Sequence, residues 1–238
     1  MHDNIDPHRS NKFLSALPKR EHERLLPHLE ICDLNFGDIL FEPDDLIEHV
    51  YFPVSGIVSL ISLATGHAKI SIGMIGKEGI VGLPVYLGSS RAQRSAVVHG
   101  AGKALRMKSV DLLNICELGG VFPSLLNRFT NLFITSLSQI LICTRFHGIE
   151  LRLVCWLLMA QDKLDNDRLQ ITQGALSCAL GVRREAVTKA IGNLQQQRLI
   201  DYNRGTLEVV DRSRLEAAAC PCYAVVKAAE KEYINQFA

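Results

Sequence analysis

Short apolar runs separated by glycine turns dominate the first half of the chain. The runs are rich in valine and isoleucine, and turns recur between them, for example at Gly37, Gly56 and Gly66. Many short strands bounded by turn residues are typical of a closed β-barrel or β-sandwich. The pattern therefore predicts a β-roll from Glu30 to about Met107, with short helices over residues 11–29 before it. The expected strands cover residues 31–34, 39–41, 49–52, 57–61, 69–74, 96–98 and 104–107.

From Ser109 onward the apolar period becomes helical. Residues 111–117 predict a short helix, residues 123–147 one long helix, and residues 149–163 a third. The long helix is apolar on more than one face, so it has two surfaces to bury. One face can pack on the barrel of the same chain. The other can be covered by the body of a monomer or by a partner helix in a coiled-coil-like dimer.

Residues 171–200 predict two helices joined by a tight turn. Thr172 can cap the first helix, and Gly181 permits the left-handed backbone that ends it. The second helix, residues 183–198, buries a stripe at helical spacing that consists of Ala186, Val187, Ala190, Ile191 and Leu194. This is the arrangement of a helix-turn-helix, whose second helix enters the major groove of DNA.

The side chains beside that stripe have the chemistry to contact DNA. Arginine can bind guanine through two acceptors, and glutamate can accept from the amino group of cytosine. Thr172 and Gln173, at a helix N-terminus, suit phosphate contacts. A hairpin with the turn Asn203-Arg204-Gly205 follows, which makes the motif a winged helix-turn-helix with Arg204 placed to contact the DNA backbone. Base reading is expected of Arg183, Arg184, Glu185, Thr188 and Lys189.

Charge favours this interpretation over a helical hairpin that only packs. Residues 168–204 hold six basic and two acidic residues, a local net charge of +4, whereas the whole chain carries +1. Such asymmetry is typical of nucleic-acid binding. Because DNA readers of this type pair across two half-sites, we expect the long helix to form a homodimer interface. The expected interface residues are Leu126, Phe129, Phe133, Leu137 and Ile140.

Composition and the absence of known motifs limit the other functions that the chain could have. A chain of 238 residues, 47% hydrophobic and 21% charged, has room for two globular domains. No apolar run approaches the roughly 18 residues of a membrane helix, and the polar N-terminus lacks a signal core. A cytoplasmic location without membrane contact is therefore expected. No HExxH, P-loop or GxSxG motif occurs, which argues against an enzyme.

Seven cysteines are scattered along the chain without a framework of spacings. Their odd number and apolar neighbours indicate reduced thiols that serve as small core residues. Cys220-Pro221-Cys222 is the one close pair, and two thiols do not complete a tetrahedral metal site. The sequence therefore predicts no metal site.

Five segments together resemble the Crp/Fnr family of bacterial transcription regulators. The resemblance implies an α+β fold: an N-terminal β-roll like a cyclic-nucleotide-binding jelly roll, a long dimerisation helix and a C-terminal winged helix-turn-helix. The corresponding regions are residues 1–108, 109–148 and 149–238. The segments are FGDILFEPDD (36–45), VYFPVSGIVSLIS (50–62), GKEGIVG (76–82), QRSAVV (93–98) and GVRREAVTKAIGNLQQQRLI (181–200).

The resemblance also implies function. It implies a homodimer that reads a near-palindromic operator in double-stranded DNA, works with RNA polymerase and is switched by a signal at the β-roll. The base-reading positions of the family fall on Arg184, Glu185 and Lys189. The last is usually arginine, and lysine lacks the bidentate fork, so the preferred half-site is expected to differ. The rival hypothesis is a ligand-sensing module that regulates a protein partner without binding DNA.

The sequence leaves the signal open. Gly76, Glu78, Arg94 and Ser95 resemble the residues by which family members bind cyclic nucleotides, but the 16 positions between Glu78 and Arg94 exceed the family's spacing and argue against such a ligand. Only Cys32 lies in the first hundred residues, which excludes an N-terminal four-thiolate iron–sulfur cluster. The candidate haem ligands lack a second-ligand signature, so no cofactor is required. Those candidates are His49, His67 and His99.

Overall fold

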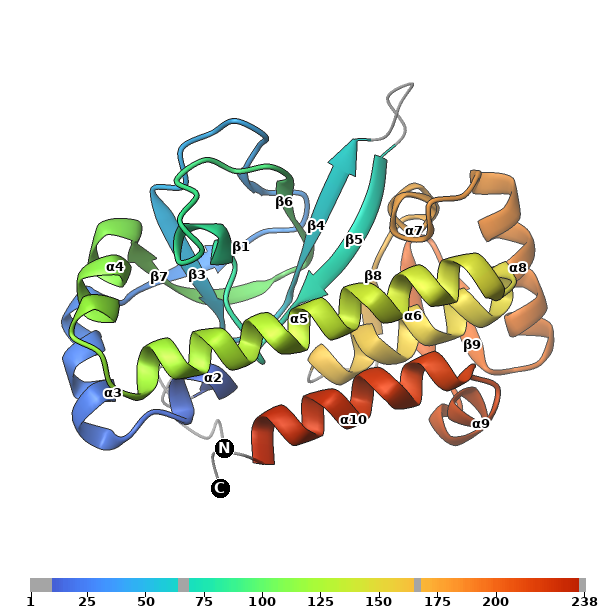
Figure 1. The fold of residues 1–238 in the computed structure, drawn as a ribbon. Helices are drawn as coiled ribbons and strands as arrows, with labels where there is room; N and C mark the ends of the chain where they lie inside the picture. Colours follow the sequence, from blue (N-terminus) through green and yellow to red (C-terminus); the bar gives the residue numbers. More distant parts are fainter. Residues whose placement is uncertain (1–9, 64–68, 165–167, 236–238) are drawn as a thin grey trace, which may run out of the picture.

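A β-rich domain and a helical domain lie at opposite ends of the molecule in the computed structural model, which describes residues 10–63, 69–164 and 168–235. The long helix α5 (Val121–Phe146) runs alongside both domains (Figure 1). Two apolar cores correspond to the two ends. The first holds the β-rich domain with the first half of α5, and the second joins the end of α5 to the helical domain. The fold is the α+β arrangement expected from the sequence.

Two antiparallel sheets form the β-rich domain. One has the strand order β1-β7-β3 and the other β2-β6-β4-β5. Val50, Phe52, Val58 and Leu105 are fully buried in one continuous core, because alternate residues of a strand point to the same face. The observed strands match the expected ones to within a few residues, which confirms the β-roll. The strands are β1 (Glu30–Leu34), β2 (Ile39–Phe41), β3 (His49–Pro53), β4 (Ile57–Leu63), β5 (Lys69–Ile75), β6 (Ser95–Gly100) and β7 (Gly102–Lys108).

Short helices connect the β-roll to α5. The Glu21 carboxylate of α3 accepts the backbone N–H groups of Val121 and Phe122 at 3.0 Å, so a side chain from a distant helix caps α5. An anion at a helix N-terminus is favourable because the helix dipole is positive there. With this cap α5 begins at Val121, two residues before the Pro123 start that the sequence predicted. The short helices are α2 (Lys12–Ser15), α3 (Lys19–Leu25), α4 (Ser109–Glu117) and the 3-10 turns η1 (Leu26–His28) and η3 (Leu83–Val85).

The apolar stripe of α5 that the sequence analysis assigned to a dimer faces into the molecule. Leu126 and Phe129 are buried in the first core of a single chain, so they are not placed to contact a partner helix, and that part of the prediction is wrong. Phe133, Leu137 and Ile140 are half-buried and line a partly open cavity.

The exposed face of α5 carries a different apolar set. Ile134 and Leu141, one heptad apart, are 55% and 70% exposed, and Phe146 is 73% exposed. The sequence could not distinguish these two stripes because both are apolar at helical spacing, and only the packing of α5 on the β-roll decides which one is covered.

The second half of the chain contains the predicted helix-turn-helix and its hairpin. A third strand, β8, which was not among the strands predicted from the sequence, pairs with β10 and extends the hairpin to a sheet of order β8-β10-β9. The elements are α6 (Ile149–Lys163), β8 (Arg168–Gln170), α7 (Gln173–Leu180), α8 (Arg184–Gln196), β9 (Ile200–Asn203), β10 (Thr206–Val209), α9 (Arg212–Ala217) and α10 (Pro221–Asn235).

The last helix, α10, packs along α5 and returns to the first core (Figure 1). Near its end Tyr233 is buried, with its ring centroid 6.2 Å from that of Phe129. Glu230 forms an ion pair with Lys12 of α2, with 3.6 Å between the charged atoms. Residues 149–238 are therefore not packed as one separate unit, because α10 contacts both cores.

No single helix within the described ranges has the length and hydropathy that a membrane crossing requires. α4 and α5 pass that test only as a pair, by length and composition alone, and they are bent by 114° relative to each other.

Candidate nucleic-acid interface

The helix-turn-helix is formed by α7, a tight turn and α8. The Thr172 hydroxyl caps α7 by accepting the Ala175 N–H at 3.1 Å, as expected. Gly181 ends α7 with a φ of 61°, a left-handed conformation that glycine adopts without steric cost. Val187 and Ala190 are fully buried, so the inner stripe of α8 anchors it against α6 and α7.

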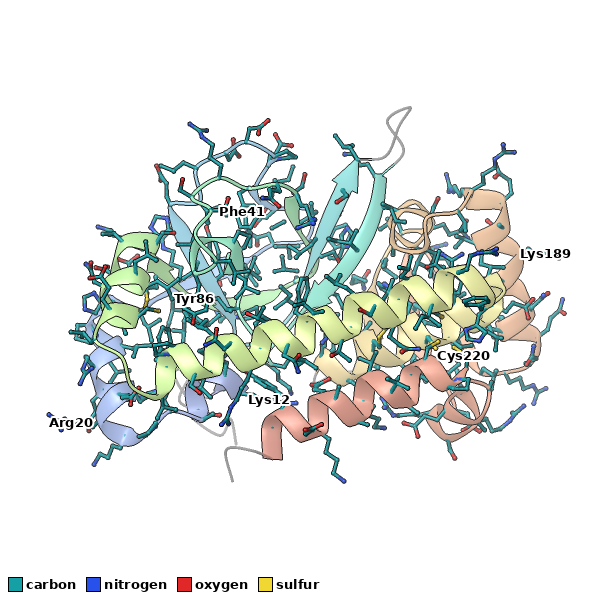
Figure 2. All side chains as sticks on the ribbon, in the orientation of Figure 1. Lys12, Arg20, Phe41, Tyr86, Lys189 and Cys220 are labelled. Atoms are coloured by element: carbon teal, nitrogen blue, oxygen red, sulfur yellow. The ribbon has the colours of Figure 1, made fainter. Side chains whose placement is uncertain are left out.

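The outer side of α8 carries the predicted DNA-contacting residues. Arg183, Arg184, Glu185 and Lys189 are exposed, and Lys189 extends from the side of α8 away from α5 (Figure 2). Within the described residues, no ion pair engages these side chains. Their charges are therefore accessible to a ligand.

Thr188 and Gln173 are linked to each other. The Thr188 hydroxyl lies 2.8 Å from Gln173 Oε1 and 3.0 Å from the Arg184 carbonyl, and it can donate its single proton to only one of them. The link holds the N-terminus of α7 beside α8. Thr188 was expected to read a base and Gln173 to bind a phosphate; in this structure both also position the two helices.

The wing is a hairpin with a two-residue turn. Asn203 and Thr206 are paired, and Arg204 and Gly205 have φ values of 47° and 85°, as a type I′ turn requires. The turn is one residue shorter than the sequence analysis gave it, and Arg204 stands exposed at its tip.

One basic residue of this region has an acidic partner. Arg168 Nε lies 2.9 Å from Glu208 Oε2 across the β8–β10 pair. The local positive charge inferred from the sequence therefore rests on the other five basic residues: Arg183, Arg184, Lys189, Arg198 and Arg204.

The turn of the helix-turn-helix is docked on the β-roll. α7 packs against β5, and a Cβ atom built on Gly181 would lie 2.8 Å from Ile70 Cδ1. The Arg152 guanidinium of α6 donates to the Leu180 carbonyl and holds the end of α7. As a result α7 lies between the β-roll and α8, and α8 faces away from the β-roll (Figure 1).

A buried ion pair provides a second link between the two halves. Glu78 of the β-roll and Lys163 of α6 are 3% and 8% exposed, and their charged atoms are 2.5 Å apart. Burial lowers the pKa of Lys163, but the negative charges of Glu78 and Glu230 outweigh this effect and raise it. Burial raises the pKa of Glu230 on α10. The pair borders a cavity of about 90 Å³ between β5, α5, α6 and α10.

The four candidate effector residues are not assembled into one site. Glu78 accepts the Gly76 N–H at 3.1 Å and is paired with Lys163, and α6 lies so close that a Cβ on Gly76 would be 2.8 Å from Lys163 Cβ. Arg94 and Ser95 are half-buried at the start of β6 and, among the described residues, do not line the cavity that Glu78 borders. The glutamate is occupied by a lysine of the same chain.

The candidate haem ligands are not grouped either. His49 lies in β3 and His99 lies in β6. His99 is buried, and burial lowers its pKa. Its Nδ1 has no hydrogen-bond partner in the described structure. His67 lies outside the described residues.

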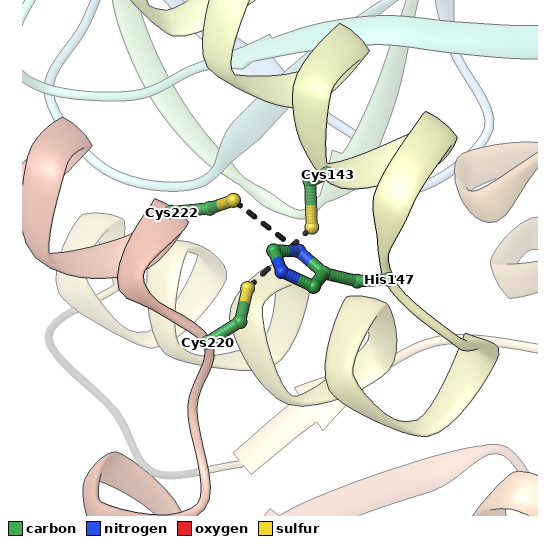
Figure 3. A group of neighbouring side chains, drawn as sticks. All are labelled: Cys143, His147, Cys220 and Cys222. Carbon is green, nitrogen blue, oxygen red and sulfur yellow. Dashed lines mark hydrogen bonds between the residues drawn. The ribbon is translucent and has the colours of Figure 1, made fainter.

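Sequence reasoning missed one group of side chains. Cys220 and Cys222 meet Cys143 and His147 from the end of α5, about 75 positions earlier in the chain (Figure 3). Cysteine and histidine four residues apart share one face of a helix, a spacing that could have identified them as ligands.

Two family models match the chain. Residues 33–118 match the cyclic nucleotide-binding domain, and residues 151–218 match the Crp-like helix-turn-helix domain. A comparison of the sequence with curated proteins gives no match.

Solved structures share the fold. FixK2 from Bradyrhizobium japonicum is 15% identical with a TM-score of 0.69, and the match covers 81% of this chain and 98% of that protein. A transcriptional regulator of the Crp/Fnr family from Eubacterium rectale is 15% identical with a TM-score of 0.67, covering 86% and 95%. The c-di-GMP responsive regulator CLP from Xanthomonas campestris is 15% identical with a TM-score of 0.61, covering 82% and 100%.

Proposed function

The chain belongs to the Crp/Fnr family of DNA-binding transcription regulators, and from that premise we propose that it binds a near-palindromic operator as a homodimer through α8. The observation that carries the proposal is the set of charged side chains on the outer side of α8, exposed and without an acidic or basic partner among the described residues. Arg184 and Glu185 lie at the start of α8, where a recognition helix contacts base edges. Lys189 follows about one turn later.

The homodimer is proposed on the exposed face of α5. Ile134 and Leu141 are separated by one heptad, and Ile142 and Phe146 extend the apolar surface toward the end of the helix. A dimer through this face would cover the large exposed side chains and present two copies of α8. Half-sites one helical turn of DNA apart, about 34 Å, are the geometry that such a dimer reads.

Regulation is proposed to act on the contact between the β-roll and the helix-turn-helix. β5 packs against α7, and Glu78 is paired with Lys163, so a signal that changes the β-roll would shift the helix-turn-helix as well. RNA polymerase is the protein partner expected of a Crp/Fnr regulator. The cytoplasm, where its DNA ligand lies, is the proposed location.

The test begins with selection of duplexes from a random pool, followed by fluorescence anisotropy. Arg184→Ala is expected to cost about 1–3 kcal/mol and to relax preference at one base pair of each half-site. Arg204→Ala is expected to weaken all duplexes alike and to lower the slope of log K against log salt by about 0.9 for each phosphate that the variant no longer neutralises. Arg20→Ala is the matched control, because Arg20 is exposed at the opposite end of the molecule (Figure 2).

Two outcomes would contradict the proposal. Absence of duplex binding at low salt would favour the rival function, a sensor that regulates a protein partner. Unchanged operator preference in Arg184→Ala would show that α8 is not the reading helix. For the dimer, light scattering should give twice the 26.4 kDa of one chain, and Leu141→Glu should return it to the monomer mass.

A further inference from the structure

Three cysteines and one histidine converge where α5 ends and α10 begins. Cys143 lies in the last turn of α5 and His147 follows that helix directly, while Cys220 and Cys222 flank the start of α10. Their side chains point toward one another (Figure 3), and the four potential ligand atoms all lie within 4.8 Å of one another. Among the described residues, this is the one such group of histidine, cysteine or carboxylate side chains.

Two of the separations between these atoms match the edges of a tetrahedral metal site. Zn–S bonds of about 2.3 Å and Zn–N bonds of about 2.0–2.1 Å give tetrahedral edges of about 3.8 Å between two sulfurs and about 3.5 Å between sulfur and nitrogen. The Cys143 and Cys220 sulfurs are 3.6 Å apart, and the Cys222 sulfur is 3.4 Å from His147 Nδ1. Both distances agree with the ideal edges to within about 0.2 Å, and the other separations among the four atoms are at most 4.8 Å.

The surroundings suit a closed site rather than a catalytic one. Cys143, Cys220 and Cys222 are buried, at 8%, 5% and 5% exposure, within the second core. Three thiolates and a divalent cation carry one net negative charge, and Arg152 lies close enough to Cys143 for their charges to interact. A fourth thiol, Cys155 of α6, lies 3.1 Å from the Cys220 sulfur at the edge of the group.

We propose that Cys143, His147, Cys220 and Cys222 bind one zinc ion in a structural site. Three thiolates with one imidazole are a common ligand set of structural zinc, and four protein ligands leave no open position for substrate or water. An iron–sulfur cluster distributes its ligands over two or more metal atoms, whereas these four atoms lie within 4.8 Å of one another, which suits a single ion. The site is independent of the DNA-binding function proposed above.

Zinc at this position would fix α10 on α5. Cys143 and His147 lie at the end of α5 just before Gly148, where the chain turns into α6, and Cys220 and Cys222 are the first anchors of α10. The other end of α10 reaches the first core through Tyr233. The ion would therefore hold in place the helix that spans both cores, and its binding energy would contribute to folding.

The experiment measures the metal content of the full chain purified under reducing conditions. We expect close to one zinc ion per chain by elemental mass spectrometry, and we expect the zinc-free protein to bind Co²⁺ with the absorption of tetrahedral cobalt and thiolate-to-cobalt charge transfer. Cys222→Ser and His147→Ala should lower the zinc content to near zero. Cys116→Ser, a half-buried cysteine on α4, is the matched control and should retain the ion, as should Cys155→Ser.

A variant that fails to fold does not affect the test, because Co²⁺ binding is also measured on the zinc-free wild-type chain. Zinc-free protein that gives no thiolate-to-cobalt absorption would overturn the proposal. So would full zinc content in Cys222→Ser, or a disulfide between Cys220 and either Cys143 or Cys155 in freshly prepared protein, detected by mass spectrometry after thiol blocking.

Discussion

Replacement of Lys163 by methionine isolates the link between the β-roll and the helical domain. The substitution keeps an apolar side chain of similar length but removes the cation that faces Glu78. Glu78 is 3% exposed and then keeps the Gly76 N–H as its hydrogen-bond donor. Removing one partner of a buried ion pair is strongly destabilising, typically by about 3–5 kcal/mol, because the other charge is left without compensation.

Removing the remaining charge of the pair as well should relieve this cost. The double variant Glu78→Gln with Lys163→Met leaves no buried charge at the pair and should recover most of the loss.

Urea denaturation followed by circular dichroism measures these differences. We expect Lys163→Met to lose about 3–5 kcal/mol at pH 7. A loss below about 1 kcal/mol at pH 7 would refute the reasoning. A double variant as unstable as Lys163→Met would also refute it, because the cost would then arise from the lysine stem rather than from the charge.

Three further predictions follow from packing, capping and burial. Gly79→Ala places a Cβ about 2.1 Å from the Phe129 ring, so we expect a loss of more than about 2 kcal/mol, measured by thermal unfolding, and a neutral result would contradict the packing of α5. Glu21→Gln removes the anionic cap of α5 and should cost about 1 kcal/mol in urea, whereas the exposed Glu23→Gln should cost almost nothing. Burial lowers the pKa of His99, so the neutral ring stabilises the fold above about pH 6.5 and this contribution is lost as the pH falls. His99→Gln should flatten the loss of stability below about pH 6.5, and an unchanged pH profile would argue against burial of this ring.

The features predicted from the sequence are those that depend on neighbouring residues. The β-roll strands follow from alternation and glycine turns, and the helix-turn-helix follows from Thr172, Gly181 and the stripe through Val187 and Ala190. The family resemblance added the order of the domains, which the matched models at residues 33–118 and 151–218 support.

The features that could not be predicted from the sequence depend on contacts between distant segments. Glu78 and Lys163 are 85 positions apart, and Cys143 and Cys220 are 77 positions apart. No local periodicity in the sequence predicts a contact between residues so far apart. The same reason explains the error on α5, because the packing of Phe129 against the β-roll, and not its spacing along the helix, decides which apolar stripe is covered.

The path of α10 has a practical consequence for protein engineering. A chimera that joins this recognition module to a foreign sensor at the α5–α6 junction would separate Tyr233 from its aromatic neighbour Phe129. The transplanted segment would then expose an apolar surface that its new host does not match. Exchange of modules in this protein therefore requires redesign of the surface along α10, and not only a well-chosen fusion point.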